Sequence, residues 1–222
     1  MKPKFSKRRN EGLTRADVIA LLVIAVIIIS LVIFPMLAAA DRSAQQLNCL
    51  SNLKQISLAI RIWDGDDDTN TPAAAMNEMR TELLVKGNVA GWFQAASNIL
   101  YTPKILICPA DIDHSVAATN FQDDFNNSHI SYFVSPDANE MYPLTILSGD
   151  DNLAISNIPV KSGLLYLATN APVAWTAARH RHSGNIAFAD GSETEVSDSR
   201  LQQSLVLATN GTPFTTNRLV IP

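Results

Sequence analysis

VIALLVIAVIIISLVIFPMLAAA, the stretch from Val18 to Ala40, contains 23 residues and no Asp, Glu, Lys, Arg or His. As a helix that rises about 1.5 Å per residue, it would span roughly 35 Å, enough for the hydrocarbon core of a bilayer. Pro35 lies inside the stretch and is expected to kink the helix, or to remove one backbone hydrogen bond, without ending it. The sequence therefore predicts a transmembrane helix over residues 13–40.

The charges are distributed unevenly around this apolar stretch. The chain of 222 residues has a net charge of -4, yet its first twelve residues carry five Lys or Arg against one Glu. Basic residues before a transmembrane helix favour a cytoplasmic amino terminus. We therefore expect a single-pass protein of the inner membrane with a periplasmic carboxy-terminal domain. That domain is acidic and has no evident Lys/Arg face, which argues against nucleic acid as a partner.

A cleavable signal peptide would share several of these features. A basic segment, an apolar run and three alanines before Asp41 also describe a signal whose removal after Ala40 would release a secreted binding module or enzyme. The apolar run is, however, longer than the ~7–15 residues usual in signal peptides. Apolar residues then recur at helical spacing from Leu47 to Ile60, which predicts that the helix continues as an amphipathic segment over residues 41–63.

The entry to the apolar stretch resembles a known processing site. GLTRADV, from Gly12 to Val18, follows a basic leader and is similar to the cleavage and methylation segment of type IV prepilins and type II secretion pseudopilins. The resemblance implies that prepilin peptidase removes a leader of residues 1–12 by cutting after Gly12. It also implies N-methylation of Leu13 and an assembly role for Asp17.

Three positions depart from the usual pattern of that family. It has Phe, an apolar residue and Glu where this sequence has Leu13, Arg15 and Asp17. A carboxylate at the edge of the hydrocarbon is costly unless it finds a partner, and the family's partner is the methylated amino group of a neighbouring subunit. Alternatively, Asp17 and Arg15 lie at the headgroup level, with Arg15 extended outward, in a chain that stays an unprocessed membrane anchor.

Further stretches are similar to a pseudopilin-like family of planctomycetes and verrucomicrobia, in which a His is followed after nine residues by Asp-Gly. Here that pattern runs from His180 to Asp190 and Gly191. The other similar stretches are Cys49 to Ile56, Cys108 to Asp111, Ser131 to Val134 and Thr145 to Asp150. The resemblance implies an α+β pilin-like fold, other pilin-like subunits as partners in a homo- or hetero-filament, and a secretion or pilus assembly platform.

The exported body, residues 64–222, has the pattern of an α+β domain with an antiparallel sheet. Asp190-Gly191 predicts a tight turn between strands 185–189 and 193–197, and residues 199–209 predict a short helix capped by Asp198 or Ser199, with Gly211 beyond its end. Residues 73–104 are weakly helical in pattern. Strands are also expected over residues 105–108, 129–135, 143–147 and 163–168.

Few residues of the body indicate chemistry. Cys49 and Cys108 lie on the exported side, which favours a disulfide between them over two buried thiols. His180 and His182 would share a face on a strand but are too few for a metal site, so we interpret His180, Asp190 and Gly191 as structural.

The acidic run from Asp64 to Asp68 does not fit a calcium loop, so no cofactor or metal is predicted and calcium has only weak support. No catalytic motif is present, and the sequence favours a pseudopilin over an enzyme.

Overall fold

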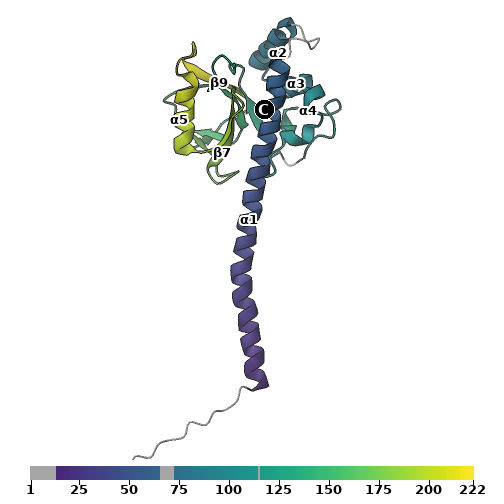
Figure 1. The fold of residues 1–222 in the computed structure, drawn as a ribbon, viewed down its shortest axis with the longest axis vertical. Coiled ribbons are helices and arrows are strands. Elements are labelled where there is room, and N and C mark those ends of the chain that lie inside the picture. The colour runs from purple at the N-terminus through teal and green to yellow at the C-terminus, as the bar shows by residue number, and fades with distance from the viewer. Residues whose placement is uncertain (1–13, 66–72, 115) are drawn as a thin grey trace, which may run out of the picture. The chain divides into compact units, whose positions relative to one another are not determined.

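A computed structural model describes residues 14–65, 73–114 and 116–222 of the chain (Figure 1). Helix α1 (Arg15–Gly65) runs through Pro35 without a break, which confirms the prediction of one long helix that Pro35 does not end. Gly12 and Leu13, the predicted cleavage and methylation positions, lie outside the described residues. The chain divides into two compact units, Met1–Ser43 and Ala44–Pro222.

Within the first unit, α1 exposes its side chains on every face. Residues 14–43 are exposed apart from Ser30, which is half-buried. The Ser30 hydroxyl lies within hydrogen-bond distance of the carbonyls of Val26 (2.8 Å) and Ile27 (2.9 Å), so the helix itself satisfies this polar group. By length and composition this part of α1 could cross a membrane.

The second unit is built on a six-stranded antiparallel sheet. Its strands in spatial order are β5 (Gly163–Ala168), β9 (Thr216–Ile221), β1 (Tyr132–Val134), β2 (Ile146–Asp150), β7 (Ser183–Phe188) and β8 (Glu193–Ser197). A smaller sheet has the order β4 (Ile158–Pro159), β3 (Leu153–Ile155) and β6 (Val173–Trp175). The predicted α+β class, with a long helix before antiparallel sheets and a short helix near the end, is confirmed.

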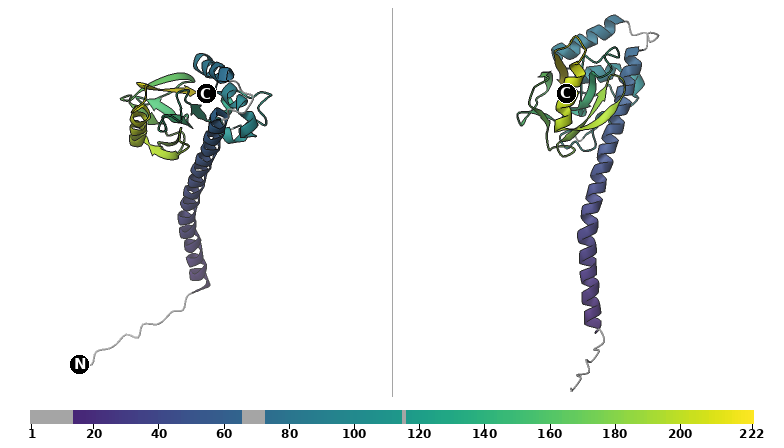
Figure 2. Two further views of the ribbon diagram at one scale, coloured as in Figure 1. Left: turned by 45° about the horizontal axis from the view of Figure 1, so that its top comes forward. Right: turned by 60° about the vertical axis from the view of Figure 1, so that its left-hand side comes forward.

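Helical segments pack around these sheets together with the last turns of α1. They are α2 (Ala73–Lys86), α3 (Val89–Ala95), α4 (Ser97–Leu100), η1 (Pro103–Leu106), η2 (Asn127–His129) and α5 (Asp198–Thr209). Helices α3 and α4 lie on the opposite side of the sheet from α5 (Figures 1 and 2). This arrangement gives the sheet a buried face on each side.

Alternating side chains of the strands divide the interior into two cores. In β1, Tyr132 and Val134 belong to the core under α1, α3 and α4, whereas Phe133 points into the core under α5. In β9, Val220 belongs to the first core and its neighbours Leu219 and Ile221 to the second. Successive side chains of a strand point to opposite faces of the sheet, so neighbouring residues belong to different cores.

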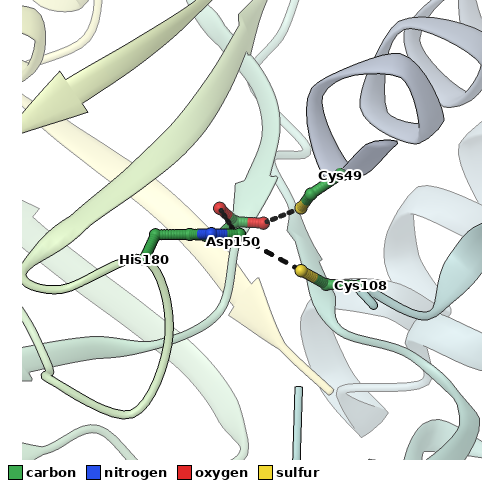
Figure 3. A group of neighbouring side chains, drawn as sticks. All are labelled: Cys49, Cys108, Asp150 and His180. Atoms are coloured by element: carbon green, nitrogen blue, oxygen red, sulfur yellow. Dashed lines mark hydrogen bonds and ion pairs between the residues drawn. The ribbon is translucent and has the colours of Figure 1, made fainter. Parts of the chain in front are cut away.

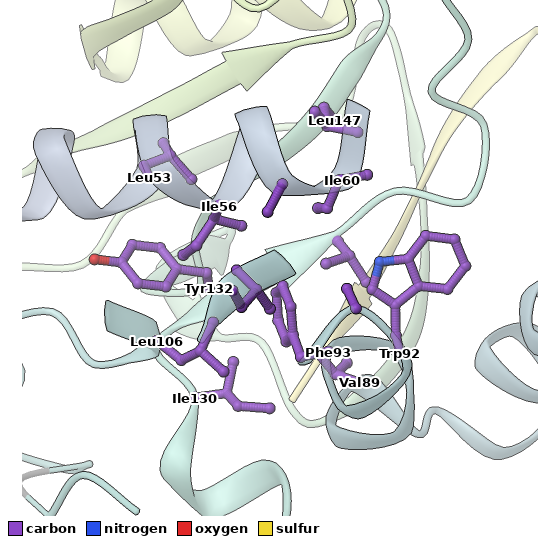
Figure 4. Close-up of a cluster of buried hydrophobic side chains, with 14 of the residues drawn as sticks. Leu53, Ile56, Ile60, Val89, Trp92, Phe93, Leu106, Ile130, Tyr132 and Leu147 are labelled. Atoms are coloured by element: carbon purple, nitrogen blue, oxygen red, sulfur yellow. The ribbon is translucent and has the colours of Figure 1, made fainter. Parts of the chain in front are cut away.

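The last turns of α1 enter the first core (Figure 4). Cys49, Leu53, Ile56, Ile60 and Trp63 follow one another at four- and three-residue steps, and all are at most 5% exposed. Leu47, which the sequence placed on the same face, is 66% exposed. The buried face therefore includes Cys49, which the sequence pattern had not placed on it.

Several strands differ from the sequence prediction. The apolar run 105–108 was predicted as a strand, but Pro103 starts the short helix η1, which ends at Leu106. Strands β3, β4, β6 and β9 were not predicted. The α5 cap is Ser197, one residue before the expected Asp198, whose carboxylate instead accepts a hydrogen bond from the backbone N–H of Trp175 (2.7 Å).

The predicted Asp190-Gly191 turn joins β7 to β8. Gly191 has a φ of +84° and its N–H donates to the carbonyl of Phe188 (3.0 Å), while Asp190 Oδ1 accepts from the N–H of Ser192 (2.8 Å). A positive φ is strained for residues with a β-carbon, and a side chain at this position would collide with the guanidinium of Arg61.

Replacing Gly191 with valine should therefore lower the free energy of unfolding by about 1–3 kcal/mol. Gly211, with a φ of +74°, is the matched control, because a β-carbon added there would have no neighbouring atom within 4 Å. Gly211→Val thus adds the backbone strain without a collision. Thermal unfolding followed by circular dichroism compares the two variants. A Gly191→Val protein as stable as wild type would contradict the prediction.

Candidate functional site

Four side chains from distant parts of the sequence meet in the interior of the body. Cys49, Cys108, Asp150 and His180 each offer one donor atom, and these atoms all lie within 4.8 Å of one another (Figure 3). The side chains of Asp150 and His180 are 0% and 2% exposed, and both cysteines are buried. This cluster, called the Cys/Asp/His cluster below, is the strongest candidate site in the described residues.

Each element brings one member to the cluster. Cys49 lies on the buried face of α1, Cys108 follows the extended residue Ile107 after η1, and Asp150 ends β2. The N–H of Cys108 donates to Ser131 Oγ (3.0 Å), just before β1, which holds the η1 segment against the sheet. The cluster therefore connects α1 and the η1 segment to the end of β2, and the bond to Ser131 connects Cys108 to the start of β1.

His180 reaches the cluster from an unusual turn. His180, Arg181 and His182 have φ angles of +43°, +53° and +62°, three consecutive left-handed residues without a glycine. Ser183 Oγ donates to the carbonyl of His180 (2.6 Å) and begins β7. The two histidines are therefore not on a strand, and they do not share a face: His180 is directed inward while His182 is exposed. Strain of this kind is concentrated at functional sites.

The donor atoms contact one another directly. The Cys49 thiol donates to Asp150 Oδ1 (3.0 Å), and Cys108 Sγ lies 3.2 Å from His180 Nε2. His180 Nε2 is also 3.7 Å from Asp150 Oδ2. The same ring nitrogen therefore faces both Cys108 and Asp150. In a Cys-His-Asp catalytic triad, the thiol and the carboxylate would face opposite nitrogens.

Residues around the cluster hold its members in place. Asp150 Oδ2 accepts hydrogen bonds from the backbone N–H (2.8 Å) and the side-chain amide (3.0 Å) of Asn185. The Tyr132 hydroxyl lies 3.2 Å from Cys49 Sγ and donates to the Cys49 carbonyl (3.4 Å). With Asn185 bound to Oδ2, the other oxygen of Asp150 accepts the hydrogen bond from Cys49.

Burial and mutual contact shift the pKa values of these groups. Burial raises the pKa of the Cys49 thiol far above its usual value. The hydrogen bond with Cys49, helped by His180 against the effect of burial, lowers the pKa of Cys108 to about 6. Burial raises the pKa of Asp150, although the charge of His180 and the Cys49 thiol oppose it. Cys108 is consequently the more readily ionised of the two thiols.

The expected disulfide between Cys49 and Cys108 is not formed in the structure, where both residues are free, buried thiols. The two sulfurs lie within 4.8 Å of each other, and Cys49 contacts Asp150 while Cys108 contacts His180. His180 contacts Cys108 and Asp150, and no contact joins it to Asp190 or Gly191 among the described residues.

An ionic network adjoins the cluster. Arg179, whose side chain is 4% exposed, pairs with Asp111 (2.5 Å) and Asp151 (2.6 Å) and donates to the carbonyl of Ser131 (3.0 Å). His114 Nδ1 lies 2.9 Å from Asp111. Burial alone would raise the pKa of Asp111, but the hydrogen bond with His114 and the charge of Arg179 hold it well below its usual range.

The other acidic residues considered lie outside the Cys/Asp/His cluster. Asp17 Oδ2 accepts from the N–H (2.9 Å) and the hydroxyl (2.7 Å) of Thr14, and the N–H of Asp17 lies 3.3 Å from that hydroxyl, so the pair caps the start of α1. Asp190 stabilises the hairpin turn, and Glu193 accepts from Ser57 (2.7 Å). Of the acidic run from Asp64 to Asp68, residues 66–68 lie outside the described residues.

All four residues of the cluster lie in stretches that the sequence analysis had singled out. The sequence did not show that these residues come together in space. Each of the stretches Cys49–Ile56, Cys108–Asp111 and Thr145–Asp150, together with the motif that starts at His180, contributes one donor. The signal that could have found the site was the presence of one ligand-type residue in each of these stretches.

The chain matches no family model, and no curated protein or solved structure was found to be similar to it. The candidate site therefore depends on its own geometry: two thiols, one imidazole and one carboxylate, buried and convergent, which is a donor set able to hold a metal ion.

Proposed function

We propose that this chain is a pilin-like subunit, a pseudopilin, of a type II secretion or type IV pilus-like filament of the bacterial envelope. The observation that carries the proposal is the continuity of α1. Its first part exposes apolar residues on every face, while the last turns of the same helix, from Cys49 to Trp63, are buried in the first core of the folded body.

The continuity of α1 supports a retained helix over a cleaved signal peptide. Ala38 to Ala40, the small residues before the alternative cleavage point, lie in the middle of α1. Cutting there would divide a helix whose later residues are part of the core. An anchor alone would also need only about 20 apolar residues, and α1 extends well beyond them.

In the proposed filament, the exposed apolar part of α1 packs against the same part of neighbouring subunits. In an environment without water, such helices associate through van der Waals contact and complementary shape. The leader would be removed after Gly12 by prepilin peptidase and Leu13 methylated. The chain would first be held in the inner membrane with its body in the periplasm, and then be added to the filament by an assembly platform.

The amino terminus and the intact mass of the protein from its native envelope test this proposal. We expect a chain that starts at a methylated Leu13. A start at Asp41 would instead indicate a secreted protein released by signal peptidase, and a start at Met1 a permanent membrane anchor. Either of these results would overturn the proposal.

A further inference from the structure

We propose that Cys49, Cys108, Asp150 and His180 bind one zinc ion, which fastens α1 and the η1 segment to the central sheet. The centre would lie wholly within the body and would stabilise it whether or not the chain assembles into filaments. The proposal rests on the spacing, the chemistry and the burial of the four donors.

The spacing fits a tetrahedral ion. Zinc binds sulfur at about 2.3 Å and nitrogen or oxygen at about 2.0–2.2 Å, so the donors at the corners of its tetrahedron are about 3.3–3.8 Å apart. Within the cluster, Cys49 Sγ lies 3.0 Å from Asp150 Oδ1 and Cys108 Sγ lies 3.2 Å from His180 Nε2, and all four donor atoms lie within 4.8 Å of one another. Small shifts of the side chains would bring all four donors to coordination distance.

The directions of the donors also converge. His180 presents the same nitrogen, Nε2, to Cys108 and to Asp150, as expected when the three share a central ion. Asn185 engages Asp150 Oδ2, and Oδ1 remains directed toward Cys49 Sγ. An outer hydrogen bond to a ligating carboxylate is typical of metal sites, where it fixes the orientation of the ligand.

The donor types select the metal. Two thiolates and an imidazole in tetrahedral arrangement suit zinc, whereas calcium requires six to eight oxygen ligands. Two thiolates and a carboxylate bring three negative charges, and zinc would reduce the total to one. Zinc would thus offset the negative charge of donors that lie in a buried, low-dielectric interior.

The burial of the donors points to a structural role. Structural zinc sites have four protein ligands, whereas catalytic sites keep one position open. The open cavity nearest to the ionic network has a volume of about 260 Å³ and is lined by Arg179, His114 and Asp151. In the described part of the chain, none of the four donors lines this cavity, so a substrate entering it would not reach the ion.

The full chain, extracted in detergent without added metal or chelator, tests the proposal by its zinc content. We expect about one zinc per chain, and cobalt substitution should produce the thiolate-to-cobalt absorption of a two-sulfur site. Both cysteines should resist alkylation until a chelator is added, and the chelator should lower the melting temperature by at least about 5 °C.

Two matched variants distinguish the loss of a zinc ligand from a change in the surrounding turn. His180→Asn should weaken zinc binding by more than about tenfold, whereas His182→Asn should leave it unchanged. Both positions have a positive φ, which asparagine tolerates, so the backbone cost is matched. The measurements on wild type need no variant and remain decisive if His180→Asn fails to fold.

Three results would overturn the proposal. One is a wild-type chain that neither contains nor takes up zinc or cobalt while its two thiols are free. Another is a Cys49–Cys108 disulfide, recognised by resistance to alkylation until a reductant, and not a chelator, is added. The third is equal zinc affinity in the His180→Asn and His182→Asn proteins.

Discussion

Replacing Arg179 with methionine is expected to lower the free energy of unfolding by about 3–5 kcal/mol. The side chain of Arg179 is buried between Asp111 and Asp151, whose side chains are 0% and 6% exposed. Methionine has a similar length but no charge, so Asp151 would remain buried without its cation and Asp111 would keep only His114 as an ionic partner. Removing one partner from a buried ion pair costs far more than a surface pair is worth.

Urea unfolding at neutral pH measures this effect, with Arg200→Ala as control, because Arg200 is exposed on α5. The control should change the free energy of unfolding by less than about 0.5 kcal/mol. An equal and small change in both variants would show that the network around Arg179 contributes little to stability.

Acid should affect the same network in wild type. The pKa of Asp111 is lower in the folded chain than in an unfolded chain, so its ionised form stabilises the fold above about pH 4, the unfolded value. That stabilisation is lost as the pH falls further, toward the folded pKa. The loss should be smaller in Arg179→Met, because one of the groups that lowers the pKa is gone.

Replacing Asp17 with asparagine is expected to reduce incorporation into filaments to background while leaving membrane insertion intact. This prediction rests on the proposed pilin-like function, in which the Asp17 carboxylate pairs with the amino terminus of a neighbouring subunit. Asparagine keeps an oxygen able to accept the two hydrogen bonds from Thr14, so the cap of α1 is preserved. Only the charge is removed, and a charge pair is strong in surroundings with little water.

The matched variant is Asp17→Glu, which keeps the charge and should assemble. The fraction of protein in sheared filaments, compared with the fraction that stays in the membrane, measures both variants. If Asp17→Asn assembles as well as wild type, the carboxylate serves only to cap its own helix. If both variants fail to insert, Asp17 acts before assembly.

Sequence patterns over short stretches correctly predicted the elements whose formation depends on neighbouring residues. The apolar run and the helical spacing after it predicted α1, the Asp190-Gly191 pair predicted the β7–β8 hairpin, and the bounds of β5 agree with the predicted 163–168. These features are determined by hydrophobic period and turn preference, which neighbouring residues are enough to specify.

Strands that depend on distant partners were not predicted. β3 and β6 have three residues each and β4 has two, too few for a period to be recognised. β9 begins with Thr216, Asn217 and Arg218, a polar start with little strand signal, yet it pairs along its whole length with β5. In contrast, the apolar run at 105–108 resembled a strand but is preceded by the helix-starting Pro103.

The Cys/Asp/His cluster could not be predicted for the same reason. Its members come from four separate stretches of the chain, and His180 lies in a turn with left-handed backbone. Spacing alone suggested a pair of His180 with His182, which the structure separates. What brings the four donors together is the packing of α1, the segment after η1 and the turn before β7 against β2, and that packing is a property of the whole body.

The position of β9 has a consequence for how the body is made. β9 lies between β5 and β1 in the sheet, although it follows every other described strand in chain order. Until Thr216–Ile221 has left the ribosome, β5 has no partner in the large sheet and β1 has only one. The large sheet therefore closes only once β9 has been made and has docked between β5 and β1, so a shorter piece of the body lacks a complete sheet.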